Sequence, residues 1–134
     1  MDFMATILQN SKTIAVVGLS DKKDRPSFVV ASYLLAKGYV IFPVNPNLSD
    51  WRGIKAYKSL SEIKEKIDIV DIFRKSEDVL PIVQEAISLN PKPQTIWMQL
   101  SVINEEAAKI ARNAGLNVIM DKCIKIEHSL QASQ

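Results

Sequence analysis

The sequence predicts a doubly wound α/β fold, in which helices cover both faces of a sheet of about five parallel strands. Short runs rich in Ile, Val and Phe recur along the 134 residues, and each gap between them can hold one crossover helix. Apolar and polar residues do not alternate strictly within these runs, which is typical of strands buried on both faces. The predicted strands are Thr13–Val17, Tyr39–Val44, Ile67–Phe73, Thr95–Gln99 and Asn117–Met120.

Helix start and stop signals occupy the gaps between the strands. Pro26 opens an apolar stretch and Gly38 stands where a helix would end, since proline favours the first helical position and glycine the position just past the last. Ser76 and Asn104 each precede acidic residues and apolar residues at helical spacing. We therefore expect a helix after each of the first, third and fourth strands.

The composition fits one globular domain over residues 1–134, with an N-terminal helix or arm over residues 1–12 and a flexible tail over residues 129–134. The 17 basic and 15 acidic side chains are dispersed, so no face for nucleic acid is predicted. No apolar run approaches the roughly 20 residues that span a bilayer, and the chain does not open like a secretory signal. We expect a cytoplasmic protein that binds neither nucleic acid nor membrane.

The loop after the first strand has the residues of a phosphate-binding turn. Ligands of such sheets bind beyond the carboxyl ends of the strands, where the strand order reverses. Gly18 permits a tight turn, the following helix offers free amides, and Arg25 or a lysine can hold an anion. The candidate residues are Gly18, Leu19, Ser20, Lys22, Lys23, Arg25, Pro26 and Ser27. The alternative is a polar loop with ordinary helix caps.

A dinucleotide site of the NAD type is not favoured. The first loop lacks Gly-x-Gly-x-x-Gly, and no acidic residue ends the second strand to bind a ribose hydroxyl. That strand runs instead into Pro43, Val44, Asn45 and Pro46, where the prolines restrict the backbone. Asn45 and the Val44 carbonyl are candidate contacts for an adenosine or pantetheine group, and a rigid turn is the alternative.

Arg74 and Lys75 directly follow the third strand, at the start of a predicted helix. A guanidinium group in that place can bind a phosphate, and the alternative is an exposed ion pair with Glu77 or Asp78. Phe73 is a candidate either for the pocket lining or for the core.

Trp97 and Gln99 end the fourth strand. The indole ring of Trp97 can pack against adenine or pantetheine, or it can belong to the core. The Gln99 amide can meet the amides of a ligand, so we include both residues in the candidate site.

Cys123 and His128 are the single cysteine and the single histidine of the chain. A thiolate beside an imidazole is a nucleophile and base in many acyl transfers, but no third orienting residue is identifiable here. We predict no catalytic group; Cys123 is the one candidate nucleophile, and a structural thiol is the alternative. No metal site is predicted, because a tetrahedral zinc site needs further cysteine or histidine ligands.

Six short blocks, in order along the chain, carry a family resemblance. They are Val17-Gly18-Leu19-Ser20, Arg25-Pro26-Ser27, Gly38-Tyr39, Pro43-Val44-Asn45-Pro46, Phe73-Arg74 and Met120-Asp121-Lys122-Cys123. Together they resemble the CoA-binding domain family, over most of the chain, and this family is similar to the N-terminal domain of the succinyl-CoA synthetase α subunit. The resemblance implies a Rossmann-like domain that binds coenzyme A across the strand carboxyl ends, with the first loop near the phosphates and the second strand's end along the ligand.

The resemblance implies binding of CoA and does not imply turnover; binding of acyl-CoA and assembly as a homodimer are further expectations. We therefore expect a non-catalytic carrier, sensor or protective module rather than an enzyme. Two alternatives stay open: an enzyme that acts on CoA thioesters or CoA disulfide through Cys123, and an NAD(P)-type oxidoreductase on the same fold. A mixed disulfide between Cys123 and the CoA thiol is a further option.

Overall fold

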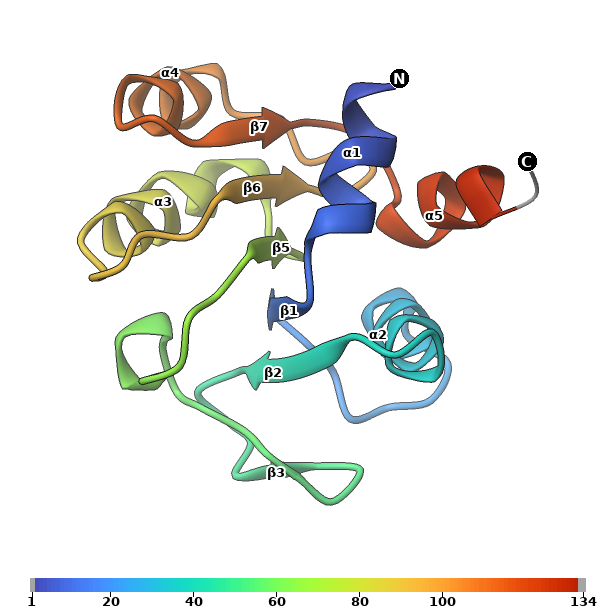
Figure 1. Cartoon of the computed structure of the whole chain (residues 1–134). Helices are drawn as coiled ribbons and strands as arrows, with labels where there is room; N and C mark the ends of the chain where they lie inside the picture. The colour runs from blue at the N-terminus through green and yellow to red at the C-terminus, as the bar shows by residue number, and fades with distance from the viewer. Residues whose placement is uncertain (1, 133–134) are drawn as a thin grey trace.

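The computed structural model describes residues 2–132 and has a parallel sheet of five strands in the order β2, β1, β5, β6, β7 (Figure 1). Every neighbouring pair of strands in this sheet runs parallel. The strands are β1 Thr13–Val17, β2 Val40–Val44, β5 Ile69–Ile72, β6 Thr95–Met98 and β7 Asn117–Ile119. The predicted doubly wound, Rossmann-like fold is confirmed, although four of the five strands are one to three residues shorter than expected.

Helices cover both faces of this sheet (Figure 1). On one face lie α3, Val79–Ile87, and α4, Glu105–Asn113, with a short 3₁₀ helix, Leu60–Glu62. On the other lie α1, Phe3–Asn10, α2, Pro26–Ala36, and α5, Ile124–Ala132. The strands therefore contribute to one hydrophobic core on each face.

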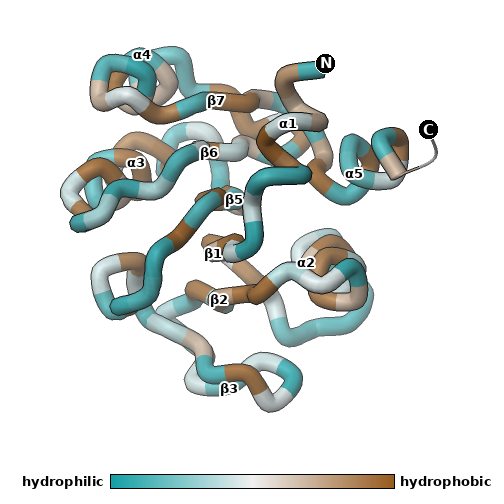
Figure 2. Tube along the Cα trace, viewed as in Figure 1, coloured by the Kyte–Doolittle hydropathy of each residue, from teal (hydrophilic) through white to brown (hydrophobic). Residues whose placement is uncertain are grey.

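Alternate residues of each strand point into the two cores. In β1, Ile14 and Val16 pack on the side of α2, whereas Ala15 and Val17 pack on the side of α3. Figure 2 shows mostly hydrophobic strands, such as β1, β2 and β5, between helices that mix hydrophilic and hydrophobic residues. Because neither face of these strands meets water, both sets of residues are apolar, which explains the missing alternation in the sequence.

The strand order reverses between β1 and β5. From β1 the chain passes over one face, through α2, to reach β2; from β5 it passes over the other face, through α3, to reach β6. The loops that leave β1 and β5 therefore diverge toward opposite faces. Such divergence opens a crevice at the carboxyl ends of the two strands.

A small antiparallel hairpin, which the sequence did not predict, follows β2. It consists of β3, Asp50–Trp51, and β4, Ile54–Lys55. Trp51 is buried, and its indole nitrogen donates to the Ser20 carbonyl at 3.1 Å. The hairpin thus supports the loop that leaves β1.

Three of the predicted helix boundaries are confirmed and one differs. Pro26 is the first residue of α2. Gly38 follows α2 with a φ of 98°, and Asn104 caps α4 by accepting from the Ala107 amide at 2.9 Å. The Ser76 hydroxyl instead accepts from the Ile103 amide, so it does not cap a helix. A 3₁₀ helix, Ser76–Asp78, therefore precedes α3.

The two ends of the described chain are helical and lie side by side. The helix or arm expected over residues 1–12 is helix α1, which Asp2 caps through the Met4 amide. The tail expected over residues 129–134 is helical as far as Ala132, because α5 packs against α1 and α2; residues 133 and 134 lie outside the described residues. No helix within residues 2–132 is both long and apolar enough to cross a bilayer.

Candidate functional site

Two adjoining cavities open at the carboxyl edge of the sheet, beside the point where the strand order reverses. The larger has a volume of about 620 Å³ and lies between the loops after β5 and β6, the first turns of α2, and Cys123. The smaller, about 240 Å³, lies between the loop after β1 and the N-terminus of α2. Both are lined by Pro26 and Phe73, so together they form one extended site.

The smaller cavity faces the N-terminus of α2. Pro26 occupies the first helical position, and the side chain of the preceding Arg25 makes no capping hydrogen bond. The Ser27 hydroxyl accepts from the Ser20 amide at 3.0 Å, which fixes the loop against the helix. Free backbone amides, the positive end of the helix dipole and the exposed Arg25 guanidinium make this end suitable for an anion.

Gly18 sits where the loops after β1 and β5 approach most closely. Its φ is +85°, and a Cβ atom there would collide with the Phe73 carbonyl oxygen and lie 2.9 Å from Arg74 Cδ. Only glycine fits this conformation and this space. The close approach that requires glycine is therefore between two backbone segments of the protein itself.

The larger cavity is mostly apolar. Val30, Leu100 and Val102 join Phe73 and Cys123 in its wall. Among the described residues, no aspartate or glutamate forms part of the lining of either cavity.

Gln99 is the one buried polar side chain in this wall, at 4% exposed. Its Oε1 accepts from the Ile124 amide, at the start of α5, at 3.1 Å. This hydrogen bond fixes the orientation of the Gln99 side chain and occupies its carbonyl oxygen. The Gln99 amide nitrogen is then the group that can donate to a ligand.

Hydrogen bonds between loops hold the rim of the larger cavity. The Ser76 hydroxyl, after β5, donates to the Ser101 carbonyl, after β6, at 3.3 Å. The Ser101 amide in turn donates to Asp121 Oδ1, after β7, at 2.7 Å. These bonds connect three successive loops, so the rim is preorganised rather than loose.

Arg74 lines the larger cavity and also forms the ion pair that the sequence offered as an alternative. Its Nη2 lies 3.5 Å from Asp78 Oδ2, with the two side chains 43% and 42% exposed. An exposed pair of this kind contributes little free energy. Arg74 can therefore exchange Asp78 for a ligand phosphate at small cost.

Nine of the predicted residues line the two cavities, and the rest lie elsewhere. Those in the lining are Gly18, Ser20, Arg25, Pro26, Ser27, Phe73, Arg74, Lys75 and Gln99. Those outside it are Leu19, Lys22, Lys23, Pro43, Val44, Asn45, Pro46 and Trp97.

The polar groups after β2 form hydrogen bonds within the protein. Asn45 donates from Nδ2 to the Leu19 carbonyl at 2.9 Å and accepts at Oδ1 from the Asn47 amide. The Val44 carbonyl accepts from the Gly18 amide at 2.9 Å. These residues join the loops after β1 and β2, so they shape the smaller cavity from behind.

Leu19 and Trp97 lie in the core and expose no surface. The Trp97 indole nitrogen donates to the Lys122 carbonyl at 2.8 Å, so this residue takes the core position that was the alternative to ligand packing. Lys22 and Lys23 are exposed in the loop after β1 and line neither cavity.

Several residues that line the larger cavity were not among the candidates from the sequence. They are Val30, Ser76, Leu100, Ser101 and Val102. Three of them directly follow β6, where the rule that ligands bind beyond the strand ends applies as it does after β1. Val30 lies one helical turn beyond Pro26, on the same face of α2.

The fold separates Cys123 from His128. Cys123 lines the larger cavity, whereas His128 lies in a pocket at the opposite edge of the sheet, with Nδ1 2.7 Å from the Tyr33 hydroxyl. They do not form a nucleophile and base pair. Within residues 2–132 no group of three or more His, Cys, Asp or Glu side chains is placed to hold a metal ion.

Known proteins are similar to this chain in sequence and in fold. The family model described as CoA binding domain matches residues 12–129. The uncharacterised protein YneT of Bacillus subtilis (strain 168) is 44% identical over 124 residues, which cover 92% of this chain and 90% of YneT. The structure of a hypothetical protein from Pyrococcus horikoshii OT3 superimposes with a TM-score of 0.92 and 36% identity, over 96% of this chain and 89% of that one.

A larger enzyme contains a similar segment. The 4-hydroxybutyrate–CoA ligase [ADP-forming] of Nitrosopumilus maritimus (strain SCM1) is 28% identical over 125 residues, which cover 86% of this chain but 18% of the ligase. The similarity therefore concerns one part of the ligase and does not extend to its whole reaction. The chain belongs to the CoA-binding domain family, and its sequence is related to that of ADP-forming CoA ligases.

Proposed function

We propose that the protein binds coenzyme A or acyl-CoA along the carboxyl edge of its sheet, as a non-catalytic carrier, sensor or protective module. The observation that carries this proposal is a helix N-terminus suited to an anion beside an adjoining apolar cavity. Coenzyme A has two parts that match these features: phosphate groups at one end and a pantetheine arm at the other. Membership of the CoA-binding domain family supports the assignment.

Each part of the site has a role in this proposal. Arg25 and the first amides of α2 bind phosphate groups, and Arg74 adds a second guanidinium from the loop after β5. The apolar wall of the larger cavity holds the pantetheine arm, with the Gln99 amide nitrogen as a donor to its carbonyl groups. The protein's contribution is to bind and shield the ligand.

Isothermal titration calorimetry with pure CoA tests this proposal. We expect saturable binding at or below high micromolar concentration. Arg25→Ala should weaken it by about tenfold or more, because a charge-assisted hydrogen bond contributes roughly 1.5–3 kcal/mol. Arg112→Ala is the matched control, since Arg112 is an exposed arginine on α4, away from both cavities.

Two results would contradict the proposal. One is the absence of binding heat with wild-type protein at high micromolar CoA. The other is equal loss of affinity in the Arg25 and Arg112 variants, which would point to nonspecific attraction by net charge. Circular dichroism of each variant confirms that the fold is intact.

The position of Cys123 favours a second candidate, an enzyme acting on CoA thioesters or CoA disulfide. Its thiol lies in the wall of the same apolar cavity that would hold the pantetheine arm. Cys123→Ser separates the two functions. If CoA affinity survives in this variant while a CoA-dependent turnover present in wild type is lost, the enzyme replaces the binding module.

A further inference from the structure

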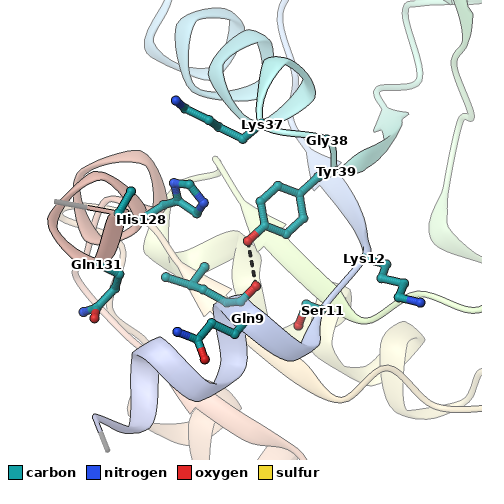
Figure 3. Close-up of a pocket in the computed structure, with 10 residues that line it drawn as sticks. Gln9, Ser11, Lys12, Lys37, Gly38, Tyr39, His128 and Gln131 are labelled. Atoms are coloured by element: carbon teal, nitrogen blue, oxygen red, sulfur yellow. Dashed lines mark hydrogen bonds between the residues drawn. The ribbon is translucent and has the colours of Figure 1, made fainter. Parts of the chain in front are cut away.

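A third pocket, of about 340 Å³, opens at the amino edge of the sheet (Figure 3). It lies where α1, α2 and α5 end and where the chain enters β1 and β2. Figure 3 shows His128 of α5 beside Tyr39, with Lys37 above and Gln9 below, and with the Gln131 amide turned away from Tyr39. The site proposed for CoA is at the other edge of the sheet.

Several carbonyl groups at the ends of α1 and α2 are hydrogen-bonded within the protein. The Tyr39 hydroxyl donates to the Leu8 carbonyl at 2.7 Å, and the Ser11 hydroxyl donates to the Ile7 carbonyl at 2.6 Å. The Lys37 amide donates to carbonyls in the last turn of α2. These carbonyl groups are therefore less available to a cation.

The side chains that remain carry positive charge or donate hydrogen bonds. Lys12 and Lys37 line the pocket, and no aspartate or glutamate does. In the part of the chain that the structure describes, neither lysine forms an ion pair. Two carboxylates hydrogen-bond to residues of the lining: Asp68 accepts from the Lys12 amide, and Asp2 accepts from the Gln131 side chain.

His128 presents one ring nitrogen to this pocket. Its Nδ1 is 2.7 Å from the Tyr33 hydroxyl, and its ring packs edge-on against Tyr33 and Tyr39. With the tyrosine as donor to Nδ1, the other nitrogen carries a proton and becomes a donor. Burial first, and then the charge of Lys37, lower the pKa of His128, so the empty pocket favours the neutral ring.

We propose that this pocket binds a small anion, a carboxylate or a phosphate, through Lys37, His128 and the side-chain amide of Gln9. Lys12, at the opposite rim in Figure 3, adds a second positive charge. The inference is independent of CoA binding, because none of these residues lines the cavities at the carboxyl edge.

NMR of the His128 Cε1–H group tests the site directly, because the chain has one histidine and the resonance needs no assignment. Inorganic phosphate and acetate are titrated separately at constant ionic strength. We expect at least one of them to shift the resonance saturably and to raise the pKa of His128, since a bound anion favours the charged ring. The anion that saturates identifies the class of ligand.

Lys37→Gln should weaken this binding about tenfold, as expected for loss of one charge-assisted contact. Lys109→Gln removes the same charge from an exposed position on α4 and should leave the affinity unchanged. The proposal is overturned if both anions produce only the drift that sodium chloride produces, or if the two lysine variants bind alike. Thermal denaturation shows whether each variant remains folded.

Discussion

The two edges of the sheet offer ligands opposite surroundings. At the carboxyl edge, α2 begins beside a mostly apolar site of two cavities; at the amino edge, α1, α2 and α5 end around a polar pocket. Helices that follow parallel strands present amide donors at one edge and carbonyl acceptors at the other. The carboxyl edge can therefore attract an anion through its backbone, whereas the amino edge needs lysine side chains to do so.

Glycine substitution should show the largest difference between the edges. Gly18→Ala adds a backbone collision at the carboxyl edge to an unfavourable φ, so we expect a loss of about 4 kcal/mol or more in the free energy of unfolding. Gly38→Ala at the amino edge has a similar φ of +98° but open space around the added Cβ, so a loss of about 1–2 kcal/mol is expected. Urea denaturation measures both.

Equal losses of unfolding free energy in these two variants would show that the close approach of Gly18 to Phe73 does not exclude a side chain at position 18. CoA titration of the Gly18 variant, under conditions where it is folded, gives a second reading. Affinity should fall with Gly18→Ala and stay unchanged with Gly38→Ala, because Gly18 alone of the two lines a cavity at the carboxyl edge.

Two aspartates, one directly before β5 and one within it, should change stability in opposite directions when each is replaced by asparagine. Asp68, at the amino end, accepts from the Lys12 and Thr13 amides at 2.7 and 3.1 Å. Asp71, nearer the carboxyl end, exposes no surface, and neither of its carboxylate oxygens has a hydrogen-bond partner among the described residues. At neutral pH we expect Asp71→Asn to raise the free energy of unfolding by about 2 kcal/mol and Asp68→Asn to lower it by about 1–2 kcal/mol.

The pH dependence of stability isolates the effect of Asp71. Burial raises its pKa well above the ordinary carboxyl value, so the folded state keeps a proton that the unfolded state has lost. Wild-type stability should therefore fall as pH rises from about 4 toward the folded-state pKa, by up to roughly 1.4 kcal/mol per pH unit. Urea denaturation across this range should show a flatter profile for Asp71→Asn; parallel profiles would contradict the assignment.

The smallest expected effect concerns the exposed pair between Arg74 and Asp78. Asp78→Asn frees the guanidinium group and should tighten CoA binding about two- to fivefold, the range expected for a surface ion pair. Glu77→Gln is the control, because it removes the same charge from a neighbouring residue that forms no ion pair among the described residues. Similar tightening in both variants would mean that net charge, rather than release of Arg74, sets the affinity.

The strands could be predicted because burial on both faces leaves a direct mark on the sequence. The hairpin of β3 and β4 could not, since two-residue strands are too short to show any period and Trp51 is held by a distant carbonyl, that of Ser20. The sequence also does not reveal that residues 129–132 are helical. The last part of α5 is held by packing against α1 and α2, which is a tertiary effect.

The lining of the cavities could be predicted where position after a strand was enough. Part of the loop after β1, and Arg74 after β5, line the cavities because the carboxyl ends of neighbouring strands meet at one edge. Trp97 and Asn45 do not line the cavities, and the sequence could not show this. A position near a strand end does not reveal where the side chain points or whether its polar groups form hydrogen bonds within the protein. Those choices depend on partners far away in the sequence.

The most direct test of the account is to add CoA to the protein and map the change at every backbone amide by NMR. Perturbations should concentrate in the loop after β1, the first turn of α2 and the loops after β5 and β6, and should be absent around Lys37 and His128. Perturbations centred on the amino edge, or none at saturating CoA, would contradict it.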